Sequence, residues 1–484
     1  MTALRTYLKK DHRFTILILI CIQLLLTLPF INFHPIALDE PFTIFHSQKS
    51  FGDLLSLFTN ENNPPLHFIL VHFWIKLFGI GVVQLRLLSL IFSLITIPIL
   101  FNLSLKIFNK QYNIALLISG LFIFSTFHHF HAVEIRVYSI LVLLFSLIVS
   151  DLYRLIFEQA EGRIWTLIFW NICLIYAHYL GFIIIISELI IGLVFIRQIS
   201  KTAKIKLLIG ALVMVLSFIP IMQIFLTRLG TVSSSGTWVQ APHWTELYGN
   251  ILRFFNGTVA FFLILFVLLI LFIREKNKDY SVSLIFTKKN VFIILFFAIP
   301  YFGMYLISIF FEPVFIDRYL LFTTIPLYLT FGIVVKYITQ NKLTFEFVLI
   351  ALLPLIIFLN YEPNNDREPD KIASYLATSY EKQEATIIIC PPYFDKTLLY
   401  HLDQNVFSQP VKFDSLLMKR NIFPIFNSQE LASIELMDIV RFIDVNASFT
   451  LPENNIIIEL LKSYDMIDSA GFKGGVTVYK LSKK

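Results

Sequence analysis

Long apolar runs recur over the first three quarters of this 484-residue chain, and they constrain its fold more than any other feature. A helix needs about 20 apolar residues to cross the roughly 30 Å hydrocarbon core of a membrane. About eleven runs meet this requirement, near residues 14–31, 83–105, 111–127, 138–157, 164–178, 179–196, 207–226, 254–273, 291–311, 319–335 and 343–360. We therefore predict a polytopic α-helical membrane protein. The count depends most on 164–196, where two runs touch.

The distribution of charge supports this count. Of all residues 57% are hydrophobic and 15% are charged, which excludes an ordinary soluble protein. Cytoplasmic loops are enriched in Lys and Arg, and here the N-terminus and every second loop carry most of them. The N-terminus is therefore predicted to be cytoplasmic, and the first loop and the C-terminal residues lie on the other side. The net charge of +6 follows from this asymmetry, and no basic cluster interleaved with aromatic residues predicts nucleic-acid binding.

Other sequence signals exclude several classes of site. The first apolar run follows basic residues, as in a signal peptide, but no small-residue cleavage site follows it, so we expect it to be retained. The three cysteines, Cys21, Cys173 and Cys390, are scattered along the chain. They predict neither a disulfide framework nor a cysteine metal site.

Two carboxylates, Asp39 and Glu40, lie immediately after the first apolar run. Ionisable groups at membrane depth usually face a water-filled cavity and are functional. The alternative is that they begin an ordinary solvated loop. This loop, residues 32–82, contains apolar residues at helical spacing in 51–58 and 66–78, which predict two helices lying in the membrane interface.

Two arginines are predicted near the non-cytoplasmic ends of membrane spans. Arg136 follows three histidines (His128, His129 and His131), and Arg318 opens the span at 319–335. A guanidinium at this depth is suited to a lipid phosphate. The alternatives are an ion pair between Arg136 and Glu134, or a side chain that only reaches toward the headgroups. No carboxylate or cysteine completes a recognisable zinc spacing with the histidines.

The composition changes near Tyr361. Residues 362–369 form a polar linker rich in proline and charge, and about 120 residues of ordinary soluble composition follow, enough for one small domain. Helices are predicted at 370–380, 394–402 and 455–463, and strands at 385–390, 439–445 and 476–481. This alternation predicts a small α/β domain, residues 362–484, beside a membrane domain, residues 1–361. We interpret the α/β domain as a structural or substrate-guiding cap.

Six short motifs in the same order resemble a known family. They are the Asp39-Glu40 pair, Asn63-Pro64-Pro65-Leu66-His67, Leu85-Arg86-Leu87-Leu88-Ser89, Glu134-Ile135-Arg136-Val137-Tyr138-Ser139 together with Tyr176-Ala177-His178-Tyr179-Leu180-Gly181, and Asp317-Arg318-Tyr319-Leu320-Leu321. Over residues 14 to about 335 the chain is similar to the bacterial members of the protein O-mannosyltransferase superfamily, which includes the lipid A aminoarabinose transferases.

The resemblance implies a GT-C fold and a transferase that moves a sugar from a polyprenyl-phosphate donor to a lipid, glycan or protein acceptor. The reaction would invert the anomeric carbon on the non-cytoplasmic face of a bacterial inner membrane. Asp39 would be the catalytic base, Glu40 would assist it, and Arg136 and Arg318 would bind the donor phosphate. The remaining motif residues are predicted to bind substrate: Glu134, Tyr138, His67, His178, Tyr179 and Tyr319.

The chain departs from the aminoarabinose transferases at one motif. Those enzymes carry an acid and a lysine before the paired prolines, whereas this chain has Asn62 and Asn63, with Glu61 displaced by one position. The resemblance therefore leaves a divalent metal cofactor undetermined. Two other functions stay open: a ligase that transfers a whole glycan from a polyprenyl carrier, and a transporter of lipids or glycolipids. The chain shows no internal repeat of the kind common in transporters.

Overall fold

The computed structural model describes residues 12–57, 64–235, 239–274, 286–339, 349–350, 352–355, 357, 367–446 and 455–484. Within these ranges, six helices are long and apolar enough to cross a membrane, and two bent helix pairs raise the number to eight if each pair is one span. The chain is therefore a multi-pass helical membrane protein.

The six helices are α2 with η1 (His12–Thr27 and Leu28–Phe30), α6 (Val82–Ile107), α9 (Tyr138–Glu158), the first part of α12 (Lys201–Ser235), α15 (Lys288–Phe310), and η4 with α16 (Asp317–Thr323 and Thr324–Thr339). The bent pairs are α7 with α8 (Tyr112–Ile123 and Thr126–Ala132) and α13 with α14 (Glu246–Phe254 and Thr258–Arg274).

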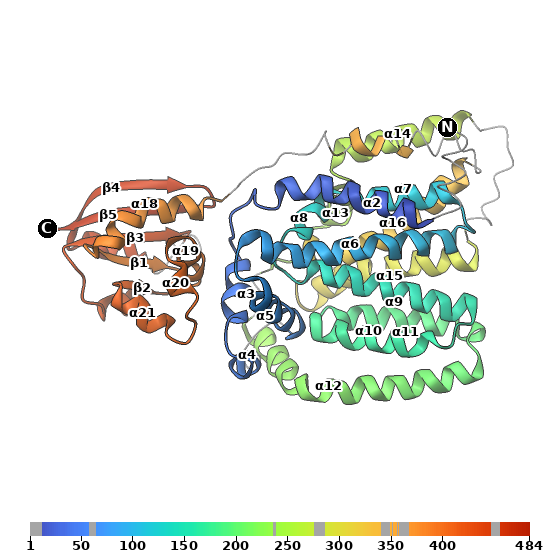
Figure 1. The fold of residues 1–484 in the computed structure, drawn as a ribbon, viewed down its shortest axis with the longest axis horizontal. Helices are drawn as coiled ribbons and strands as arrows, with labels where there is room; N and C mark the ends of the chain where they lie inside the picture. Colours follow the sequence, from blue (N-terminus) through green and yellow to red (C-terminus); the bar gives the residue numbers. More distant parts are fainter. Residues whose placement is uncertain are drawn as a thin grey trace. The chain divides into compact units, whose positions relative to one another are not determined.

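The predicted runs agree with these helices except at two places. The runs at 164–178 and 179–196 form two separate helices, α10 (Arg163–Ala177) and α11 (Gly181–Val194), which are shorter than the other spans. They contact each other and lie side by side in Figure 1. The run at 343–360 falls mostly outside the described residues. The count of eleven crossings therefore stays a prediction.

The chain folds into two compact units. Unit 1 comprises Met1–Leu28, Ser56–His67 and Arg86–Glu362, and unit 2 comprises Pro29–Leu55, Phe68–Leu85 and Pro363–Lys484. Two parts of the first loop thus belong to the same unit as the C-terminal residues. The predicted domain boundary between residues 361 and 362 stays a prediction.

Helix α9 lies at the centre of unit 1. Its side chains are buried on all faces, as expected for a helix that is apolar all round. The ring of Phe145 lies 5.8 Å from Phe296 of α15 and 5.0 Å from Phe322 of η4. Helices α9 and α10 also pack together. These contacts hold the first turn of α9, which carries Tyr138, against η4.

Unit 2 contains a five-stranded sheet with the strand order β2-β1-β3-β5-β4. The strands are β1 (Thr386–Cys390), β2 (Ile422–Pro424), β3 (Ile439–Val445), β4 (Tyr464–Phe472) and β5 (Val476–Lys483). Strand β1 is parallel to β2 and β3, and β5 is antiparallel to β3 and β4. The predicted strands correspond to β1, β3 and β5. The prediction lacked β2, which has three residues, and β4, which is mostly exposed and carries no apolar alternation.

Helices cover both faces of this sheet (Figure 1). The predicted helices are present as α18 (Pro369–Lys382), α19 (Asp395–Leu402) and α24 (Ile456–Leu461). Arg441 of β3 points toward α18, where its Nη2 donates to the Ser379 hydroxyl at 3.2 Å. The opposite face packs on α22 (Ser428–Ala432) and α24. The expected small α/β domain is therefore confirmed as a three-layer structure.

The first loop contains three helices, α3 (Glu40–Ser47), α4 (Phe51–Leu57) and α5 (Leu66–Phe78). The predicted helices at 51–58 and 66–78 are α4 and α5. Helix α3 packs on the C-terminal part of unit 2, because the Phe45 ring lies 4.6 Å from Phe413 and 5.6 Å from Phe407. Asn62, Asn63 and Glu61 lie outside the described residues.

Candidate functional site

The turn between α8 and α9 holds a largely buried carboxylate, that of Glu134. Helix α8 ends at Ala132, so the next residues turn sharply before α9 begins. In this turn the Glu134 carbonyl accepts hydrogen bonds from the Arg136 backbone N–H at 2.8 Å and from the Ser89 hydroxyl at 2.6 Å. Its Oε2 lies 2.7 Å from His131 Nδ1. The turn thus fixes Glu134 and Arg136 at the start of a central helix.

The three neighbouring histidines point to different partners. His128 Nε2 lies 2.7 Å from the Thr324 hydroxyl, and His129 bonds to the Thr27 hydroxyl and a backbone carbonyl. His131 bonds to Glu134. Among the described residues, no three His, Cys, Asp or Glu side chains lie close enough together to hold a metal ion.

The 3-10 helix η4 brings Arg318 and Tyr319 to the same region. The Asp317 carboxylate accepts a hydrogen bond from the Arg318 backbone N–H at 2.6 Å, which orders the first residues of η4. The ring of Tyr319 lies 6.4 Å from that of Tyr138 and 5.4 Å from that of His178. His178 occupies the break between α10 and α11. Three separate helix ends therefore meet here.

Arg136 and Arg318 act electrostatically on the same neighbours. Burial raises the pKa of Glu134, but the hydrogen bond from His131 and the two arginines outweigh it and hold the pKa below its usual range. Burial, and then the same two arginines, lowers the pKa of His178 to about 3. That imidazole is therefore neutral at pH 7. Two guanidiniums and the Glu134 carboxylate therefore interact with one another in this region.

We call this group the arginine cluster; its residues are Glu134, Arg136, Tyr138, His178, Arg318 and Tyr319. His67 lies beside it, since burial and then Arg136 lower the pKa of His67 to about 3. Tyr179 instead packs its ring on Phe225 of α12, at 5.5 Å. The sequence offered an ion pair between Glu134 and Arg136 as one alternative and did not predict the hydrogen bond between Glu134 and His131. The sequence signal for this bond is that His131 and Glu134 are three residues apart at the end of α8, a spacing at which side chains can meet.

The carboxylate pair belongs to unit 2. Asp39 precedes the first residue of α3, and its backbone carbonyl accepts hydrogen bonds from the Thr43 amide and hydroxyl, both at 3.1 Å. Its carboxylate does not cap the helix and is partly exposed. Glu40 is 5% exposed and begins α3. The neighbouring carboxylates therefore have different environments, one open to solvent and one buried.

The comparison with solved structures identifies the fold. The chain matches ArnT from Cupriavidus metallidurans in the apo state with a TM-score of 0.58, and the same protein bound to undecaprenyl phosphate with a TM-score of 0.59. Each match has 11% sequence identity and covers 96% of this chain and 97% of the other. The chain has the ArnT fold. No family model and no curated protein sequence matches it.

The match confirms the resemblance that the six motifs predicted. ArnT is an aminoarabinose transferase of the GT-C fold, and the similarity covers both the helical part and the C-terminal sheet of this chain. At 11% identity the match establishes the fold alone. The chemistry must therefore be argued from this chain's own residues.

Proposed function

We propose that this protein is a membrane glycosyltransferase that moves a sugar from a polyprenyl-phosphate donor to a lipid, glycan or protein acceptor. The ArnT fold supports the proposal, because one ArnT structure is bound to undecaprenyl phosphate. In this proposal the protein lies in a bacterial inner membrane with a cytoplasmic N-terminus, and the reaction takes place on the opposite side. Residues 1–361 form the membrane domain and residues 362–484 the outer domain.

The arginine cluster is the observation that carries this proposal. Arg136 and Arg318 come from two helix ends that are far apart in sequence. Both act electrostatically on the same buried groups, Glu134 and His178. Guanidiniums in partly buried surroundings form strong charge-assisted bonds to a phosphate. Neutral His178 adds a hydrogen-bonding group without adding charge. The donor phosphate is the ligand that this arrangement fits best.

The proposed reaction gives the arginines and the carboxylate pair separate roles. The acceptor oxygen attacks the anomeric carbon of the donor sugar while the bond from that carbon to the phosphate oxygen breaks. The electron pair of that bond leaves with the polyprenyl phosphate, whose new charge Arg136 and Arg318 stabilise. Asp39 takes the acceptor's proton as general base. Attack from the face opposite the leaving group inverts the anomeric carbon. Glu40 positions the loop that carries Asp39.

The remaining motif residues would shape the donor site. Tyr138, His178 and Tyr319 are in ring contact around the cluster and would flank the donor sugar. His67 would lie beside the phosphate through its proximity to Arg136. Tyr179 would contact substrate while its ring stays packed on Phe225 of α12.

Donor binding tests the phosphate site directly. We expect purified protein to bind undecaprenyl phosphate, and Arg136→Ala or Arg318→Ala to weaken binding by about 1.5–3 kcal/mol, which is about 10- to 100-fold. Arg163→Ala is the matched control, because Arg163 is half-exposed and begins α10, at the end opposite His178, where it pairs with Asp151 of α9. Wild-type affinity in both cluster variants would contradict the proposal.

Turnover separates this function from its alternatives. A transferase or a glycan ligase releases polyprenyl phosphate when supplied with donor and acceptor, whereas a transporter of lipids or glycolipids releases none. Mass analysis of the product distinguishes transfer of one sugar from transfer of a whole glycan. Extracts from a deletion strain and its parent supply the acceptor pool for this assay. Donor binding without release would leave the transporter as the better interpretation.

A further inference from the structure

A small crevice opens in unit 2 at the end of the sheet. It has a volume of about 170 Å³ and lies where the parallel strands β1 and β3 end. Tyr393 and Phe394, just after β1, and Val445, the last residue of β3, line it. The order β2-β1-β3 means that the chain leaves β1 on one side for β2 and later returns to the other side as β3. Open α/β sheets bind ligands at this position, at the carboxyl ends of strands where the order reverses.

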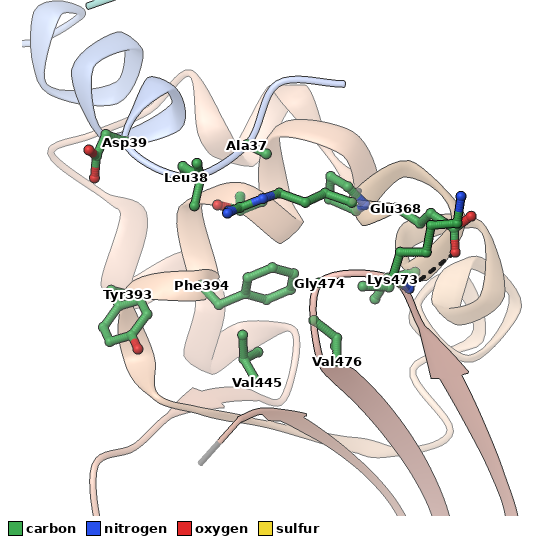
Figure 2. A pocket seen from close by; sticks show the side chains of 14 residues that line it. Ala37, Leu38, Asp39, Glu368, Tyr393, Phe394, Val445, Lys473, Gly474 and Val476 are labelled. Atoms are coloured by element: carbon green, nitrogen blue, oxygen red, sulfur yellow. Dashed lines mark hydrogen bonds between the residues drawn. The ribbon is translucent and has the colours of Figure 1, made fainter. Parts of the chain in front are cut away.

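The charged residues of the crevice are held in place by backbone contacts. Lys473 lies in the turn between β4 and β5, and its N–H donates to the Glu368 carboxylate at 3.2 Å (Figure 2). Gly474 and Gly475 continue this turn with φ of +86° and +71°, which glycine adopts without strain. The Asn446 N–H, just after β3, donates to the Gly475 carbonyl at 3.1 Å. The turn is therefore tied to both α18 and β3.

Asp39 reaches the same crevice from the first loop. The segment before it is anchored on α19, because the His401 ring donates to the Ile36 carbonyl at 2.8 Å. Figure 2 shows Asp39 and Leu38 along one side, Tyr393 and Phe394 along another, and Glu368 with Lys473 at the far end. The proposed base and the C-terminal residues thus line one space.

The lining has the chemistry that recognises a saccharide. Arg367 and Lys473 donate hydrogen bonds and Glu368 accepts them, so ring hydroxyls find both kinds of partner. The rings of Tyr393 and Phe394 offer an apolar face to the C–H surface of a sugar. The volume is below the roughly 300–1,000 Å³ of pockets for drug-sized ligands. It suits one sugar ring rather than an extended glycan.

We propose that this crevice is a subsite for one saccharide ring of the acceptor, held by Arg367, Glu368 and Lys473 against Tyr393 and Phe394, with its reactive hydroxyl toward Asp39. The assignment to the acceptor rests on the proposed glycosyltransferase function. The C-terminal residues then recognise substrate in addition to any structural role. Saccharide binding itself requires no donor, so it can be measured separately.

The test uses the full-length protein in detergent and three probes: methyl β-glucoside, glucose 6-phosphate and inorganic phosphate. Saturation-transfer NMR titrations give a dissociation constant for each. We expect both sugars to bind, and Tyr393→Ala and Lys473→Gln each to weaken binding by about tenfold or more. Both residues are exposed, so the substitutions leave the core intact. Ile458→Ala and Lys462→Gln are the matched controls, because these residues are exposed, lie elsewhere in unit 2 and do not line the crevice.

Three results would overturn the subsite: no sugar bound by wild-type protein, wild-type affinity in both crevice variants, or phosphate alone bound as tightly as glucose 6-phosphate. Undecaprenyl phosphate binding is measured on the same preparations and should be unchanged in the crevice variants. If the wild-type protein does not bind undecaprenyl phosphate, the proposed function is contradicted. If it binds undecaprenyl phosphate but no sugar, only the subsite is contradicted.

Discussion

The arginine cluster of unit 1 and the crevice of unit 2 both place cations beside aromatic rings, but they are built differently. The cluster is assembled from the ends of helices that are far apart in the chain, and its carboxylate is largely buried and hydrogen-bonded. The crevice forms where two adjacent parallel strands end, and its Tyr393 and Lys473 are exposed. Burial strengthens electrostatic interactions, whereas exposed polar groups exchange readily with water.

Because of this difference, we expect the two regions to bind different kinds of ligand. A pair of partly buried guanidiniums suits a ligand with a fixed negative charge, such as the phosphate of a membrane lipid. An open, mixed-charge crevice suits a neutral or weakly charged ligand that arrives from water. Variants of unit 1 should therefore change donor binding and local stability, whereas variants of unit 2 should change turnover and acceptor recognition.

Asp39→Asn should produce the largest effect. The amide keeps the size of the carboxylate but cannot accept a proton, so turnover should fall by roughly 10²–10⁴-fold. Donor binding and thermal unfolding should stay near wild type, because Asp39 does not cap α3. Steady-state release of polyprenyl phosphate measures the change.

Two variants make this result specific. Glu40→Gln should have a milder effect if Glu40 only positions the loop. Asp53→Asn changes an exposed carboxylate elsewhere in the first loop and should not alter turnover. An Asp39→Asn protein with near wild-type turnover would show that the pair is an ordinary loop start. A chelator added to the wild-type assay tests the open question of a metal.

Glu134→Gln should destabilise unit 1 by about 3 kcal/mol, because it removes a largely buried charge that faces two arginines. The lowered pKa gives the sign of the pH effect: the carboxylate stabilises the wild type above its unfolded pKa and loses this contribution as pH falls through the folded value. A bound phosphate would replace part of the missing charge. Undecaprenyl phosphate should therefore raise the melting temperature of Glu134→Gln by more than that of the wild type.

The matched control for this prediction is Glu161→Gln, which removes a surface carboxylate that pairs with Lys206. Surface ion pairs contribute little to stability, so its melting temperature should stay close to wild type. Equal lipid-induced shifts in Glu134→Gln and in the wild type would show that the carboxylate does not compensate for the arginines.

His46 gives the smallest expected effect and tests unit 2 alone. Burial, followed by the charges of Lys49 and Lys396, lowers its pKa from 6.5 to about 3. The unfolded chain binds the proton first, so the wild type loses stability as pH falls below about 6.5. The loss is at most about 2 kcal/mol between pH 8 and pH 5. His46→Asn should show a smaller fall in melting temperature over this range, and an equal fall would show that His46 does not titrate as described.

The sequence predicted the elements of the fold better than it predicted their contacts. Periodicity located most of the spans and three of the five strands, because apolar spacing records which face of an element is buried. Periodicity did not predict β4, because most residues of this strand are exposed and show no alternation of apolar and polar side chains. It also could not show that His178 of the α10–α11 break lies beside Tyr319 of η4, since nothing local links residues so distant in the chain.

The sequence by itself determined that this chain enters a membrane, that a polar segment follows, and which ionisable residues are candidates for a functional site. Membrane insertion and secondary structure depend on local composition, which is readable residue by residue. Only the tertiary structure decided that Glu134 bonds to His131, that Arg136 and Arg318 act on the same groups, and that Asp39 shares a crevice with Lys473. These depend on contacts between distant segments, whose geometry is set by the packing of the whole fold.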